Sequence, residues 1–128
     1  MNDHRKEPGE RRKQIIWVGK ARQDLSELPA AVKEHIGYQL RFVEAGEMPD
    51  DFKPMPTVGN GVFEIRVPDE DGRNVGRCFF VTKIEGCIAV LHSFIKTSAK
   101  TSKPDIEKGQ SRYRTLQEQI KKKNNSIK

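Results

Sequence analysis

The chain has 128 residues, of which 34% are hydrophobic, and 24 lysines and arginines against 18 aspartates and glutamates give a net charge of +6. This length suits one small domain with a modest core. No apolar run approaches the roughly 20 residues that span a bilayer, and the first residues lack the apolar stretch of a secretory signal. We therefore expect a cytoplasmic protein that does not enter a membrane.

Charge is distributed unevenly along the chain. Residues 14–71 carry eleven acidic and six basic side chains, whereas residues 72–128 carry thirteen basic and four acidic ones. A basic half beside an acidic half indicates a surface for a polyanion, although a solvated lysine-rich face would have the same composition. Cys78 and Cys87 lie in apolar runs without the spacing of a zinc site or a disulfide framework, so we expect two buried free thiols.

The two ends of the chain lack apolar periodicity, which predicts a mobile basic tail over 1–13 and a mobile lysine-rich tail over 121–128 around a domain at 14–120. The domain begins with an apolar, β-branched run that predicts a strand at 14–18.

Two helices are expected next. Apolar residues recur every three or four positions from Ala21 to Leu28 and again from Val32 to Val43, a pattern that predicts a helical hairpin. Pro29 suits the first turn of the second helix and Gly46 suits its C-terminal end. The prolines and glycines of residues 48–61 then predict a loop.

Three strands and a last helix complete the predicted domain. Strands at 61–67, 75–82 and 86–94 are separated by short joints rich in glycine and acidic residues, so a consecutive antiparallel meander is expected. The last helix opens at Pro104, with Ser102 or a neighbour as its cap, and it presents one apolar stripe: Ile106, Tyr113, Leu116 and Ile120. The predicted class is α+β, with about four mostly antiparallel strands, a helical hairpin and a C-terminal helix that either docks on the sheet or stays mobile.

The motifs of nucleotide-dependent enzymes, zinc hydrolases and serine hydrolases are absent, so we expect neither a cofactor nor a metal. Cationic residues instead gather on the predicted strands and after them: Arg66, Arg77, Lys83, Lys96, Lys100 and Lys103, with His92 near the end of the last strand. Such a set can bind phosphates. Metal-free RNA cleavage also needs cations and proton-transfer groups of these kinds, and composition alone does not separate cleavage from binding.

Several short motifs, in this order, resemble the phage-type, HigB-like branch of the RelE/ParE toxin superfamily. They are Val62-Phe63-Glu64-Ile65-Arg66, Gly76-Arg77-Cys78-Phe79-Phe80, Leu91-His92-Ser93-Phe94-Ile95-Lys96-Thr97, Lys100-Thr101 and Pro104-Asp105-Ile106. The resemblance covers roughly residues 14–120 and rests on the spacing of the pieces together.

The resemblance implies a toxin of a two-gene toxin–antitoxin module that cuts mRNA, often on the ribosome, and whose partner is an antitoxin, of the helix-turn-helix type in HigB-like pairs. By position, Arg66, Arg77 and Lys96 match the family's basic catalytic residues. The family often has a second lysine where Thr97 stands, and Lys100 is the nearest replacement.

The acid and base of the reaction are not fixed by the resemblance. His92 is the fourth catalytic candidate, and a hydrogen-bonded structural histidine is equally compatible with its place at a strand end. Tyr113 is another guess. The remaining basic side chains are expected to contact RNA: Lys83, Lys100, Lys103 and Arg112.

Three other interpretations remain open at this point. Arg66 and Arg77 can be ordinary cross-strand partners of Glu64 on a solvated face. A ParE-like toxin would act on DNA gyrase without cutting RNA, and a non-catalytic module would only bind nucleic acid, with a steep dependence on salt. The aromatic residues of the strands are expected in the core rather than as a stacking platform: Trp17, Phe79, Phe80 and Phe94.

Overall fold

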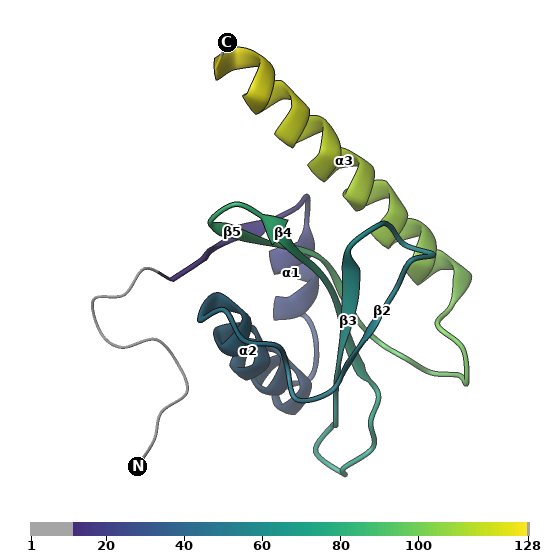
Figure 1. Ribbon diagram of the computed structural model, residues 1–128. Coiled ribbons are helices and arrows are strands. Elements are labelled where there is room, and N and C mark those ends of the chain that lie inside the picture. The colour runs from purple at the N-terminus through teal and green to yellow at the C-terminus, as the bar shows by residue number, and fades with distance from the viewer. Residues whose placement is uncertain (1–11, 128) are drawn as a thin grey trace.

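The computed structural model describes residues 12–127, with side chains through residue 124 (Figure 1). Nearly all of the tail predicted at 1–13 lies outside these residues. Within the part of the chain that is described, no helix is long and apolar enough to cross a membrane.

The centre of the fold is a five-stranded sheet with the order β1-β5-β4-β3-β2. Its strands are β1 (Gln14–Trp17), β2 (Phe52–Pro54), β3 (Val62–Val67), β4 (Gly76–Ile84) and β5 (Cys87–Ile95). The antiparallel meander β3-β4-β5 is confirmed, and β1 pairs with β5 in parallel, so the sheet is mostly antiparallel as predicted.

The short strand β2 was not predicted, because residues 48–61 were expected to be a loop. β2 pairs antiparallel with β3 and places Lys53 opposite Glu64 and Pro54 opposite Phe63. A proline lacks the backbone N–H of a regular strand, but at the edge of a sheet that donor is not needed. The prolines that suggested a loop are therefore compatible with an edge strand.

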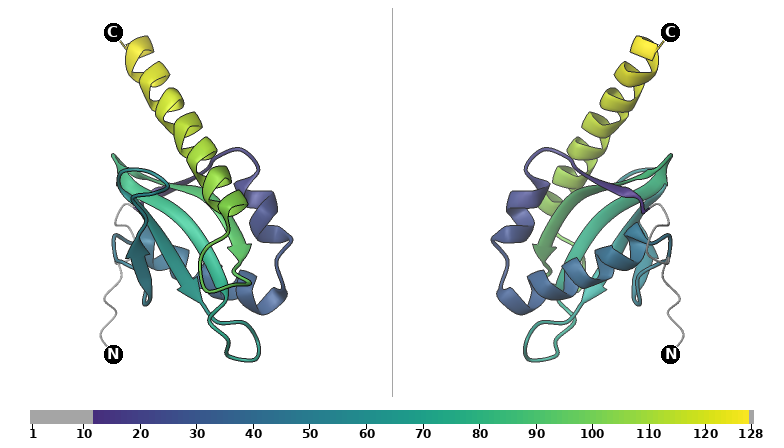
Figure 2. Two further views of the ribbon diagram at one scale, coloured as in Figure 1. Left: turned by 90° about the vertical axis from the view of Figure 1, so that its right-hand side faces the viewer. Right: turned by 90° about the vertical axis from the view of Figure 1, so that its left-hand side faces the viewer.

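The predicted helical hairpin covers one face of the sheet (Figure 2). It consists of α1 (Ala21–Ser26) and α2 (Ala30–Glu44), and Gly46 follows α2 with a left-handed φ of 89°. Buried side chains of α2, such as Ile36 and Leu40, pack in one cluster with Ile65 and Phe80 of the sheet. Burial of this apolar area is the main contribution to the stability of the hairpin.

The last helix, α3 (Lys103–Ile127), packs on the opposite face of the sheet, as its apolar stripe predicted. Leu116 is 2% exposed among Phe79, Leu91 and Phe94. The backbone N–H of Asp105 donates to Ser102 Oγ at 3.2 Å, which confirms the predicted cap.

α3 also continues past the sheet through residues 121–127, which belong to the segment predicted as a mobile tail (Figure 1). A helix that is already formed extends by satisfying its own backbone hydrogen bonds, and the consecutive lysines at 121–123 favour helix without any apolar contact.

The aromatic residues of the strands lie in the core, as predicted. Phe79 and Phe80 are fully buried, Phe94 is 6% exposed and Trp17 packs partly buried against the α2 side. The expectation for the cysteines holds only in part. Both thiols are free and Cys78 is buried, but Cys87, the first residue of β5, is only half-buried.

Candidate functional site

Arg66 and Arg77 stand directly opposite each other on β3 and β4. Alternation along the strands places both side chains on the α3 side of the sheet, the side on which Glu64 also lies. Arg66 is one-third exposed, and its Nε lies 3.9 Å from Asp51 Oδ1. The structure thus brings two of the predicted catalytic residues together.

Arg77 is almost completely buried, unlike Arg66. Its Nε lies 3.6 Å from Oε1 of Glu64, whose side chain is 0% exposed, and its Nη1 donates to the carbonyl oxygen of Gly76 at 2.9 Å. Burial lowers the pKa of Arg77, Glu64 opposes that effect and Arg66 adds to it. An arginine keeps its proton under such conditions, so Arg77 is a fixed buried cation balanced by Glu64.

Lys96 follows β5 and completes the group. Its partial burial, together with the positive charges of Arg77, Lys53 and Arg66, lowers the pKa of Lys96, and Glu64 acts in the opposite direction. We call Lys53, Arg66, Arg77 and Lys96, gathered around Glu64, the cationic cluster. A lysine with a lowered pKa exchanges protons more readily near neutral pH than an ordinary lysine does.

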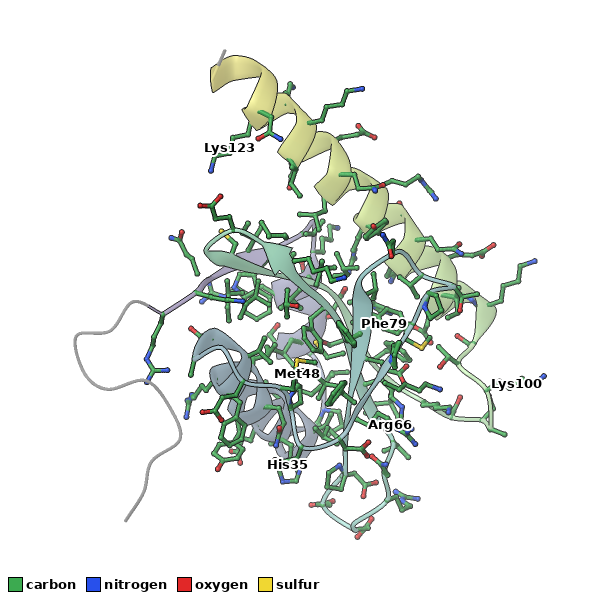
Figure 3. All side chains as sticks on the ribbon, in the orientation of Figure 1. His35, Met48, Arg66, Phe79, Lys100 and Lys123 are labelled. Carbon is green, nitrogen blue, oxygen red and sulfur yellow. The ribbon has the colours of Figure 1, made fainter. Side chains whose placement is uncertain are left out.

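The segment between β5 and α3 borders the cationic cluster. The backbone N–H of Lys96 donates to the carbonyl oxygen of Val75 at 2.7 Å, and Thr101 Oγ1 donates to Glu64 Oε2 at 3.5 Å. Lys100 and Lys103 are exposed on this segment and at the start of α3, and Lys100 points outward from it (Figure 3). Both lysines are therefore open to a polyanion that reaches the cluster.

His92 lies outside the cationic cluster, in a buried network that joins α1, β5 and α3. Its Nε2 is 2.7 Å from Asp105 Oδ1, and its Nδ1 is 3.4 Å from Asp24 Oδ2. The ring stacks on Phe94 with a centroid separation of 4.8 Å and is 4% exposed. Both ring nitrogens of His92 face carboxylates and its side chain has almost no exposed surface, which is typical of a structural histidine.

Arg112 and Lys83 are also placed apart from the cluster. Arg112 donates through Nη1 to Asp24 and, at 2.9 Å, to the carbonyl oxygen of Leu91, so its guanidinium attaches α3 to α1 and β5. Lys83 is exposed near the far end of β4 from Arg77. Tyr113 of α3, the other guess for the acid or base, donates to the carbonyl oxygen of Asn60 at 2.8 Å. Its side chain is partly buried between α3 and the sheet.

Sequence reasoning missed two contributors to the site. Lys53 was not predicted as a site residue, because its segment was expected to be a loop. The pairing of β2 with β3 places Lys53 opposite Glu64. Glu64 was considered only as a surface partner, whereas it is the buried centre of the cluster. The alternation of Val62, Glu64 and Arg66 gave the correct face, but it did not predict that α3 and the segment before it would bury part of that face.

Metal ligation has no support in the described part of the chain, where no group of three or more histidine, cysteine, aspartate or glutamate side chains is arranged to hold an ion. The cationic side chains of the cluster are able to attract phosphate oxygens and to exchange protons.

A comparison with protein families gives a match over residues 23–114 to the model for phage-derived Gp49-like proteins (DUF891). The chain belongs to the Gp49-like family. This family is one of RelE/ParE-like toxins, and the mixed five-stranded sheet with its helices agrees with a RelE-like fold. The matched residues of this Gp49-like protein include the whole cationic cluster. No curated protein matches the chain.

Proposed function

We propose that this Gp49-like protein is the HigB-like toxin of a toxin–antitoxin module and that it blocks translation by cutting mRNA without a metal. The observation that carries the proposal is the cationic cluster, in which exposed and buried cations surround one carboxylate. Partial burial of Lys96, together with the neighbouring cations, lowers the pKa of that lysine. Family membership supports the toxin class, and the cluster supports a phosphate as its target.

The proposed role of each residue in the cleavage reaction follows from how exposed its side chain is. The exposed part of Arg66 clasps the scissile phosphate, while the buried Arg77 acts through its field on the charge that develops there. The 2′-oxygen attacks phosphorus and the bond to the 5′-oxygen breaks, which leaves a cyclic 2′,3′-phosphate and a free 5′-hydroxyl. Protonated Lys96 gives its proton to the departing 5′-oxygen. The proton of the 2′-hydroxyl passes to solvent water, and neutral Lys96 regains a proton from water after the product leaves.

Two steps test the cleavage. Primer extension on a reporter mRNA after brief induction should reveal discrete new 5′ ends for the wild type. Lys96→Ala should reduce them about 10²–10⁴-fold, the usual range for loss of an acid or base. Lys33→Ala is the matched control, because it removes an exposed lysine of α2, on the face of the sheet opposite the cluster, and should leave cleavage unchanged. Purified protein should cut an RNA oligonucleotide in the presence of EDTA.

The pH dependence provides a separate check on the role of Lys96. Cleavage that needs protonated Lys96 falls as pH rises through the pKa of that lysine, which lies below 10.5. Lys96→Arg keeps the charge but stays protonated, so any remaining activity should lose this alkaline decline. An identical alkaline decline in Lys96→Arg would remove Lys96 from the proton transfer.

The partner we propose is an antitoxin, of the helix-turn-helix type, that covers the cationic cluster in the cytoplasm. If growth stops while every transcript stays intact, the nuclease proposal fails and a gyrase-directed toxin is the better explanation. Salt-sensitive RNA binding without any product would instead indicate a non-catalytic binding module.

A further inference from the structure

A cavity of about 350 Å³ opens beside Arg66, between α2 and the residues just before β2. Its lining includes His35, Tyr38, Gln39, Asp50, Asp51 and Arg66. Tyr38 is 45% exposed. The cavity thus joins an aromatic ring, carboxylates and one cation of the cluster.

The carboxylate on the wall is held in a defined position. Gln39 Nε2 donates to Asp50 Oδ2 at 2.9 Å, and the backbone N–H of Asp50 donates to Gln39 Oε1 at 2.9 Å. This reciprocal pair fixes the Asp50 side chain, which is exposed and offers Oδ1 as a further acceptor. A ring face beside a fixed acceptor is the usual arrangement for holding an unpaired base.

The cavity is connected to the cationic cluster by a chain of polar contacts. Asn74 Nδ2 donates to Asp51 Oδ2 at 3.2 Å, and Arg77 Nη1 lies 3.4 Å from Asn74 Oδ1. Arg66 belongs to both places, because it lines the cavity and faces Arg77. The carboxylates on the cavity wall repel a phosphate, whereas Arg66 attracts one. These charges favour a ligand that places its phosphate on Arg66 and an uncharged, donor-bearing group inside the cavity.

We propose that this cavity binds one unpaired RNA base, stacked on Tyr38, in the nucleotide whose phosphate lies on Arg66; this rests on the proposed ribonuclease function. Guanine fits best, because its Watson–Crick edge presents two adjacent N–H donors to a carboxylate. Uracil presents a single donor between two acceptors, which a carboxylate disfavours. The cavity accordingly sets which nucleotide lies next to the cleaved bond.

The test is an NMR titration of the full chain with each nucleoside 5′-monophosphate. GMP should shift the backbone signals of residues 38, 39, 50 and 51 at lower concentration than UMP does. Tyr38→Leu keeps apolar bulk but removes the ring, and it should weaken GMP binding roughly tenfold, the usual loss for one stacked base. Met48→Ala is the matched control, since Met48 is 40% exposed but does not line the cavity.

A second variant separates recognition from folding. Asp50→Asn keeps an acceptor for Gln39 but removes the charge, so it should fold normally and lose the preference for GMP over UMP. GMP shifts that are absent, or unchanged in Tyr38→Leu, overturn the inference. Specific GMP shifts together with intact transcripts in cells would support base binding in the cavity and refute the proposed mRNA cleavage. Cleavage of mRNA by the wild type, without GMP-induced shifts at residues 38, 39, 50 and 51, would support the nuclease and overturn base binding in the cavity.

Discussion

Replacing a helical glycine by alanine should have opposite effects at two positions, because one glycine is packed against the sheet and the other is not. An alanine Cβ at Gly37 in α2 would meet no atom within 4 Å. The same Cβ at Gly109 in α3 would lie 2.8 Å from Cδ2 of Phe79 and 2.9 Å from Cγ1 of Val58. Both substitutions give the same gain in helix propensity. The difference between the two changes in the free energy of unfolding therefore reports only the contacts of the added Cβ.

The gain in helix propensity and the cost of overpacking together decide whether each substitution stabilises or destabilises the protein. Alanine in place of glycine inside a helix favours folding by about 1 kcal/mol, and Gly37→Ala should gain about that amount. Overpacking costs about 1–3 kcal/mol, because Phe79 is fully buried and cannot swing away. Gly109→Ala should therefore lose up to about 2 kcal/mol net.

Urea denaturation of the two variants and the wild type measures these free energies directly. A change of about 1 kcal/mol corresponds to roughly 3–5 °C in Tm for a domain of this size. Equal stabilisation by both substitutions would show that α3 does not approach the sheet at Gly109, and the packing of α3 against Phe79 would be refuted.

Three further outcomes are expected. Glu64→Gln should reduce the free energy of unfolding in urea by about 3–5 kcal/mol, because Arg77 would stay buried without its counter-charge; a loss below 1 kcal/mol would contradict this reasoning. Burial raises the pKa of the Cys78 thiol to about 12, so a thiol reagent should modify half-buried Cys87 in the native protein and reach Cys78 only after unfolding. Burial raises the pKa of Asp24, but its basic partners outweigh that effect and leave the pKa below 3.8. The stability from Asp24 is present above that value and lost as pH falls through the lowered pKa, so the stability difference between wild type and Asp24→Asn should shrink in acid.

Much of the fold could be predicted because its signals are local. The three- and four-residue spacing from Val32 to Val43 fixes the buried side of α2, and strand alternation places Ile65 on one face of the sheet and Glu64 on the other. Ser102 acts as a cap through atoms only three residues away. Such patterns depend on neighbouring residues, so the sequence alone determines them.

The rest was decided by contacts between residues far apart in the chain. Whether Pro54 sits in a loop or in an edge strand depends on the free edge of β3, which no local pattern encodes. The surroundings of His92 come from α1 and α3, whose carboxylates face both of its ring nitrogens, and no local pattern in the sequence predicts those contacts. Lys53 and Lys96 are 43 positions apart in the sequence and share one electrostatic environment only because β2 and the end of β5 lie on the same sheet. The sequence determined which residues carry charge, and the tertiary structure decided which charges act together, because electrostatic coupling depends on distance in space and on burial.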